Sequence, residues 1–197
     1  GQLLPQLMLA AGVVVAPSEL PAGGSASPYQ LLVTIEGVPE DGEAEVAGVL
    51  ERLQRTGAPY TLEAGAGSAT ERWSDFLAAA GEDTLLVRAG VPGKAISRLA
   101  AAMQAFTLPA RTFFDVASGQ VYVAAKPVSV AAAQGWLAAL RQTARVLNGY
   151  AVVLAAPPPW RSQLDLWGYQ AESQALMAGL KARWDPAGIL NPGAFVI

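Results

Sequence analysis

The side chains best placed to bind a small ligand lie at alternating positions of three predicted strands. Strand-like composition is found in DTLLVRAGV, PARTFFDV and GQVYVAA. Successive side chains of a strand point to opposite faces of the sheet, so one face receives Leu86, Arg88, Arg111, Phe113 and Tyr122. Because a guanidinium group binds a carboxylate through two parallel hydrogen bonds, this face could hold a small carboxylate.

The two arginines also have a purely structural interpretation, which stays open at this point. Arg88 and Arg111 could pair with Asp115 and Glu82, or they could lie at a solvated edge of the sheet. A shift of one residue in the strand register would exchange the two faces.

The chain contains neither histidine nor cysteine. This excludes the most common general base, a Ser-His-Asp triad, a thiolate nucleophile and cysteine-based metal sites. The acidic residues are scattered and form no EF-hand loop, so we expect no metal site. No catalytic residue can be assigned, and we expect the reactive group to lie outside this chain.

The composition indicates a folded protein. Of the 197 residues 52% are hydrophobic and 15% are charged, which argues against disorder. The net charge of −3 argues against nucleic acid as a partner, and no apolar run is long enough for a transmembrane segment. The first residue is not Met, so we expect the natural protein to extend further toward its N-terminus.

The order of the predicted elements indicates an α+β fold. From residue 83 onward the pattern reads strand, helix, strand, strand, helix, strand, which is the split βαβ or ferredoxin-like unit. Such a unit has an antiparallel sheet with both helices on one face, and its other face is open to a ligand or partner. On the helix side of this sheet we place Leu85, Val87, Ala89, Val121 and Val123.

The part before residue 83 is predicted to be a degenerate copy of the same unit. It begins with a short helix that ends at Gly12, followed by a Pro/Gly/Ser-rich loop. Its further elements are a strand at 29–36, a helix at 41–56, a strand at 58–63 and a helix at 69–80. We therefore divide the chain into sub-units 1–82 and 83–160, followed by a closing helix and tail at 161–197.

The last part of the chain carries a specific family resemblance. A helix bearing Lys181 is followed by Asp185-Pro186 and then by the turn Ile-Leu-Asn-Pro-Gly at 189–193. This resembles the closing segment of FAD-linked oxidases of the vanillyl-alcohol oxidase type. The stretches LLVRAGVPGKAISRL, FDVASGQVYVAA and YAVVLAAPPPWRSQLDLWG resemble the FAD-binding (E) subunits of bacterial glycolate oxidases more closely. The related D-type subunits carry histidine-rich motifs, which this chain lacks.

The resemblance implies that residues 1–197 form the C-terminal cap domain of such an oxidase and that the FAD-binding domain is not part of this chain. In the whole protein, a 2-hydroxy acid such as glycolate or D-lactate would be oxidised to the 2-oxo acid by hydride transfer to the flavin. The fragment alone would be inactive. Asn191, Pro192 and Gly193 would approach the flavin, and Arg161 would reach the substrate or a partner subunit. Arg88, Arg111 and Tyr122 would then hold the substrate carboxylate.

The expected partners are the FAD-binding domain itself, a D-type flavoprotein and an iron–sulfur subunit. The resemblance implies a cytoplasmic protein that partner subunits hold at the inner membrane. One alternative is a catalytically silent scaffold subunit of a glycolate oxidase complex. Another is a non-enzymatic ferredoxin-like module that binds a ligand or a partner. The module predicts a hydrophilic surface around the tail, whereas the cap domain predicts a broad bare apolar face.

Overall fold

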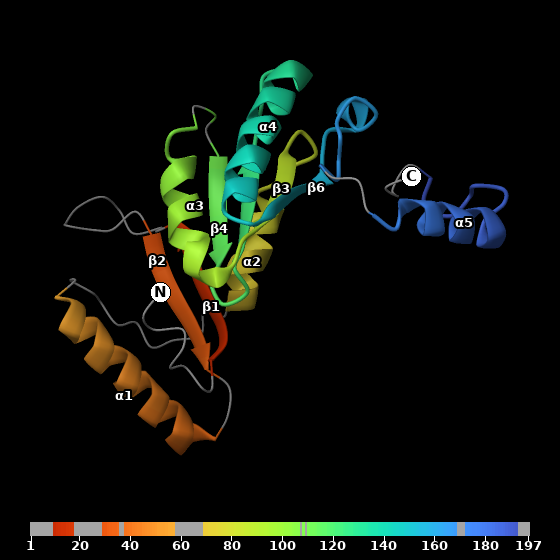
Figure 1. The fold of residues 1–197 in the computed structure, drawn as a ribbon. Helices are drawn as coiled ribbons and strands as arrows, with labels where there is room; N and C mark the ends of the chain where they lie inside the picture. Colours follow the sequence, from red (N-terminus) through yellow and green to blue (C-terminus); the bar gives the residue numbers. More distant parts are fainter. Residues whose placement is uncertain are drawn as a thin grey trace.

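The chain builds one six-stranded sheet with helices on both faces (Figure 1). The computed structural model describes residues 10–17, 29–35, 38–57, 69–106, 108, 110–168 and 172–192. The strands are β1 (Ala10–Pro17), β2 (Tyr29–Ile35), β3 (Leu85–Gly90), β4 (Ala110–Asp115), β5 (Gln120–Ala125) and β6 (Tyr150–Ala155). The α-helices are α1 (Pro39–Thr56), α2 (Ala69–Ala78), α3 (Ile96–Met103), α4 (Val130–Val146) and α5 (Gln174–Trp184), and two short 3₁₀ helices are η2 (Gly93–Ala95) and η3 (Pro158–Trp160).

The sheet has the strand order β2-β1-β4-β5-β3-β6, and every neighbouring pair is antiparallel. The second half of the chain follows the predicted order β3-α3-β4-β5-α4-β6. This confirms the α+β class, while the ferredoxin-like assignment stays a prediction. The predicted sub-units on either side of residue 82 share one sheet, because β1 pairs with β4.

The first half of the chain differs from the prediction. Residues 10–12, expected at the end of a short helix, belong to strand β1. Three consecutive valines, Val13 to Val15, explain this, because β-branched side chains favour a strand. The predicted strand at 58–63 lies outside the described residues, so the duplication of the unit stays a prediction.

One face of the sheet packs against α3 and α4 and forms the main core. Leu85, Val87, Ala89, Val121 and Val123 all point to this side and are fully buried. The predicted alternation is therefore confirmed for β3 and β5. Burying each of the larger apolar side chains contributes about 1.5–3 kcal/mol.

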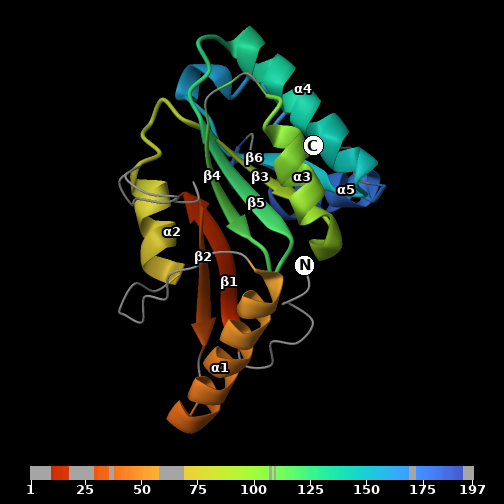
Figure 2. The same cartoon turned by 90° about the vertical axis from the view of Figure 1, so that its left-hand side faces the viewer.

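The opposite face is covered in part by α2 and is therefore not the fully open face that we expected (Figure 2). Phe76 of α2 packs in a second cluster with Leu86 and Phe113. The Trp73 ring lies 4.4 Å from the ring of Tyr122 and 5.3 Å from that of Phe113, between centroids. Trp73 and Phe76 are three residues apart on one face of α2, and this spacing gives the helix an apolar side to place on the sheet.

The turn between β4 and β5 requires glycine at position 119. Gly119 has φ +71°, and an added Cβ atom would lie 2.2 Å from the carbonyl oxygen of Val91. The Val91 amide in turn donates a hydrogen bond of 2.9 Å to the Gly119 carbonyl oxygen. The turn is thus fastened to the segment that follows β3.

We predict that Gly119→Ala lowers the free energy of unfolding by at least about 2 kcal/mol, because a left-handed backbone costs an L-residue about 1–2 kcal/mol and the Cβ atom also meets backbone. Gly135→Ala is the matched control, since nothing lies within 4 Å of an added Cβ atom in α4. It should raise the stability by up to about 1 kcal/mol. Urea unfolding measures both, and equal effects of the two substitutions would contradict this account of the turn.

Candidate functional site

Arg88 lies on β3, next to the edge strand β6, on the face that α2 covers in part. It pairs in register with Tyr122 of β5 and Val152 of β6. Its side chain is partly buried, and the Nε atom is buried with no hydrogen-bond partner in the part of the chain that the structure describes. Within the same residues no ion pair joins Arg88 to Asp115 or Glu82. The Asp115 carboxylate instead accepts hydrogen bonds from the amide and hydroxyl of Ser118.

Tyr150 supports the guanidinium group of Arg88. The ring centroid of Tyr150 lies 5.9 Å from the Arg88 Cζ atom, within the range of a cation–π interaction. Tyr150 is paired in register with Gly90. A Cβ atom on Gly90 would lie 2.6 Å from the Tyr150 ring, so the glycine leaves the space that this ring occupies.

Tyr122 and Gln120 contribute the neutral polar groups of this face. The Tyr122 hydroxyl donates a hydrogen bond of 2.8 Å to the side-chain oxygen of Gln120. The Gln120 amide nitrogen then remains as a donor that can be offered to an anion. We define the candidate anion site as Arg88, Gln120, Tyr122 and Tyr150.

The two other predicted arginines do not join this site. Arg111 of β4 pairs with Ala124 of β5, and β5 lies between β4 and β3. Arg111 is also two residues away from Phe113, the residue that pairs with Tyr122. Arg161 follows η3, is exposed, and donates its Nε–H to the carbonyl oxygen of Ala156 at 3.2 Å. The structure therefore brings together only Arg88 and Tyr122 of the four predicted substrate-binding residues.

Sequence reasoning missed Gln120 and Tyr150 as members of the site. Gln120 lies on the same strand face as Tyr122, two residues before it, so alternation could have identified it. Tyr150 could not be placed in this way, because its position depends on how the edge strand β6 pairs with β3.

The C-terminal turn is a second candidate element, and Asp185 organises it. The Asp185 carboxylate accepts hydrogen bonds from the amides of Ile189 (2.9 Å) and Leu190 (3.1 Å) and from Lys181 Nζ (2.7 Å). Lys181 also donates to the Leu190 carbonyl oxygen at 3.0 Å. The pKa of Asp185 is lowered, first by the hydrogen bond from Lys181 and then by those from the two amides, against an opposing effect of burial.

The predicted flavin-proximal residues lie on the surface of this turn. Asn191 and Pro192 are exposed, and Asn191 adopts a left-handed backbone conformation with φ +45°. Gly193 lies outside the described residues. The Asp185 network therefore fixes the backbone of the turn while its outer residues remain accessible.

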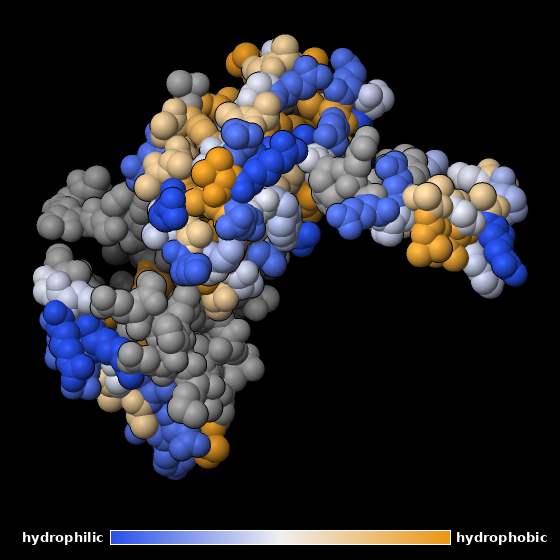
Figure 3. All heavy atoms as spheres, viewed as in Figure 1, coloured by the Kyte–Doolittle hydropathy of each residue, from blue (hydrophilic) through white to orange (hydrophobic). Residues whose placement is uncertain are grey.

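The helix before the turn has an exposed apolar surface, which we call the α5 patch. Helix α5 stands away from the sheet in Figure 1, and Figure 3 shows an apolar patch on its surface. The patch consists of Leu176, Leu180, Trp184, Ile189 and Leu190, all between 50% and 76% exposed. The first three are spaced four residues apart and so share one face of the helix. An apolar surface of this kind indicates a contact with another domain or protein.

The comparisons with known proteins do not identify a family. Neither models of protein families nor curated proteins match this sequence. The resemblance to FAD-linked oxidases therefore stays a prediction. Among the described residues, no helix is long and apolar enough to cross a membrane, and no group of acidic side chains could hold a metal ion.

We predict that the C-terminal turn loosens in acid. The ordinary pKa of an aspartate is 3.8, and folding lowers the pKa of Asp185 below this value. The carboxylate therefore stabilises the turn at pH values above 3.8, and this stabilisation is lost as the pH falls through the lowered pKa. The amide proton signals of Ile189 and Leu190 in an NMR titration should therefore shift below about pH 4, when their acceptor is protonated.

Asp185→Asn is the control for this titration. Asparagine has no charge to lose, so the acid shift of the two amides should disappear. Amide signals that move equally in both proteins would show that Asp185 does not hold the turn.

Proposed function

We propose that this chain is the substrate-covering domain of an FAD-linked oxidoreductase subunit that oxidises a small 2-hydroxy acid, with Arg88 binding the substrate carboxylate. The observation that supports this most is the partly buried guanidinium group of Arg88, whose buried Nε atom has no acceptor among the described residues. The family resemblance adds the reaction type and the cofactor.

A carboxylate fits the chemistry around Arg88. A buried donor without a partner destabilises a protein by about 1–3 kcal/mol, and more if it is charged. A bound carboxylate would remove this penalty and could also accept a hydrogen bond from the Gln120 amide. Asp115, one of the two predicted counter-ions, is engaged with the amide and hydroxyl of Ser118 instead.

The described residues do not enclose a flavin, so the flavin of the proposed oxidase would be held by another domain. One cavity among them has a volume of about 200 Å³ and lies beside α3 and α4, on the opposite face of the sheet from Arg88. Asn191 and Pro192 would contact a flavin held by another domain, and the α5 patch suits the contact with that domain. The flavin, when bound, would accept the hydride from the substrate.

The residues of this chain would bind and orient the substrate. Arg88 would fix the carboxylate, and Tyr150 would hold the guanidinium group in place. With no histidine in the chain, a general base of the usual kind would have to come from the flavin-binding domain or from another subunit. The same resemblance implies a D-type flavoprotein and an iron–sulfur subunit as partners, and a cytoplasmic place at the inner membrane through them.

The surface around the tail distinguishes a cap domain of a larger protein from a free-standing ferredoxin-like binding module. A free-standing ferredoxin-like module predicts a hydrophilic surface there, whereas the five residues of the α5 patch are apolar and exposed. This favours a domain that belongs to a larger assembly, either as the proposed cap or as a silent scaffold subunit.

The test is the visible absorption spectrum of the chain expressed together with its upstream coding region. We predict the spectrum of an oxidised flavin. Its visible absorbance should fall when glycolate or D-lactate is added in the absence of oxygen. Arg88→Gln should lower kcat/KM roughly 10- to 100-fold, because a hydrogen bond to a charged group contributes about 1.5–3 kcal/mol. Arg111→Gln is the matched control on the same face and should change kcat/KM less than about threefold.

Three outcomes of this experiment have distinct meanings. A folded protein without flavin would overturn the oxidoreductase assignment. Flavin that never bleaches would support the silent scaffold subunit. Equal losses in the two arginine variants would contradict the role of Arg88 in binding the carboxylate.

A further inference from the structure

Gly90 leaves a position without a side chain on the Arg88 face of strand β3. It comes two residues after Arg88 and therefore lies on the same face of the sheet. Its register neighbours are Gln120 of β5 and Tyr150 of β6. The end of the Tyr150 side chain occupies the space beside this glycine, because an added Cβ atom would lie 2.6 Å from the ring and 2.8 Å from the hydroxyl oxygen. Since facing Cβ positions of neighbouring strands are about 4.5–5.5 Å apart, the Tyr150 hydroxyl lies near Gln120.

The hydrogen bonds of these side chains leave both donors and acceptors unused. The single proton of the Tyr122 hydroxyl is donated to the Gln120 side-chain oxygen at 2.8 Å, so the Tyr122 oxygen remains as an acceptor. The Gln120 amide nitrogen and the Tyr150 hydroxyl have no hydrogen-bond partner among the residues that the structure describes. Asp115, the neighbour of Gln120 on β4, accepts from Ser118 instead. Polar groups of both kinds thus remain for a ligand.

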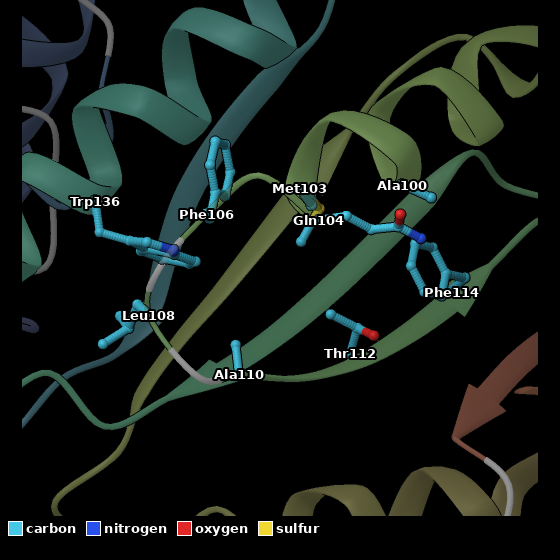
Figure 4. Close-up of a pocket in the computed structure, with 9 residues that line it drawn as sticks. All are labelled: Ala100, Met103, Gln104, Phe106, Leu108, Ala110, Thr112, Phe114 and Trp136. Carbon is cyan, nitrogen blue, oxygen red and sulfur yellow. The ribbon is translucent and has the colours of Figure 1, made fainter. Parts of the chain in front are cut away.

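These polar groups are accessible from solvent. Tyr150 is 41% exposed, and Arg88, Gln120 and Tyr122 are partly exposed. The group borders α2, whose Trp73 ring packs against the Tyr122 ring. The cavity lined by residues of α3, α4 and β4 lies on the other face of the sheet and takes no part (Figure 4). A ligand of Arg88 therefore meets these groups on the surface of the sheet, at the margin of α2.

A 2-hydroxy acid matches this arrangement more closely than related acids do. Its hydroxyl group is one carbon atom away from the carboxylate, so a small acid bound to Arg88 can contact Tyr122, the direct neighbour of Arg88 on β5. The hydroxyl can donate to the Tyr122 oxygen and accept from the Gln120 amide. The carbonyl oxygen of a 2-oxo acid can only accept, and it would leave the Tyr122 oxygen without a donor. An acid without a polar group at C2 would satisfy neither side chain.

We propose that Gln120 and Tyr122 are specificity-determining residues, which recognise the 2-hydroxyl group of an acid whose carboxylate is held by Arg88. This inference rests on the function proposed above. The Gln120 amide has two N–H donors and so can serve the hydroxyl as well as the carboxylate. The Tyr150 hydroxyl offers a further donor beside Gly90. The site would bind the 2-hydroxy acid more tightly than the 2-oxo acid formed from it, which favours release of the product.

The test compares three acids with the same three-carbon skeleton, namely D-lactate, pyruvate and propionate. They differ only at C2, which carries a hydroxyl group, an oxo group or hydrogen atoms alone. Dissociation constants are measured from the Arg88 Nε–H signal in NMR titrations of the ¹⁵N-labelled chain. D-lactate should bind about 3- to 10-fold more tightly than either of the other two acids, the range expected for a hydrogen bond between neutral groups.

Two variants test the assignment to these side chains. Tyr122→Phe removes the hydroxyl acceptor and keeps the ring that packs against Trp73. The affinity for D-lactate should fall about 3- to 10-fold, whereas that for propionate, which has no hydroxyl group, should change less than about twofold. Gln120→Leu frees the Tyr122 proton for donation to the ligand, so the preference for D-lactate over pyruvate should disappear. Propionate is the control in both variants.

The outcomes separate this inference from the proposed function. Equal affinities of the three acids, or a Tyr122→Phe variant that weakens all three by the same factor, would overturn the inference and leave the role of Arg88 in place. An Arg88 signal that responds to none of the three acids would overturn the inference together with the proposed carboxylate site.

Discussion

The covering of strand β3 on both faces is the constraint on which the rest of this structure depends. Five of its six residues are buried, with Leu85, Val87 and Ala89 under α3 and α4 and Leu86 in the cluster that α2 completes. Arg88 is the one position of this strand that is only partly buried. A charged side chain therefore lies at the one partly exposed position of an otherwise buried strand, with a buried Nε atom that has no partner among the described residues.

The arrangement separates three surfaces with different chemistry. Arg88 and its polar neighbours lie on the α2 side of the sheet and suit a small anion. The cavity beside β4 belongs to the α3 and α4 side of the sheet. The α5 patch and the turn held by Asp185 lie apart from the sheet and suit a larger apolar contact. A small anion and a neighbouring domain could thus be bound by different parts of one chain.

Local pattern was enough to predict part of this structure. Alternation in β3 and β5 placed Val87 and Val121 on the helix side and Arg88 with Tyr122 on the other, because side-chain direction follows from strand geometry alone. The packing of α2 on that second face was not predicted, because the local sequence pattern does not determine where a helix packs. Arg111 lies on the predicted face yet apart from Arg88, because distance within a sheet depends on strand order. Tyr150 was not predicted as a member of the site, because its place beside Arg88 depends on the pairing of β6 with β3.

The most direct test of the central claim is the NMR signal of the Arg88 Nε–H group during a titration with glycolate. If Arg88 binds the carboxylate, its Nε–H signal should move downfield and saturate, while those of Arg141 and Arg161, whose Nε–H groups already bond backbone carbonyls, should stay in place. An Arg88 signal that does not respond at saturating glycolate, or one that moves together with the other two arginines, would contradict the account.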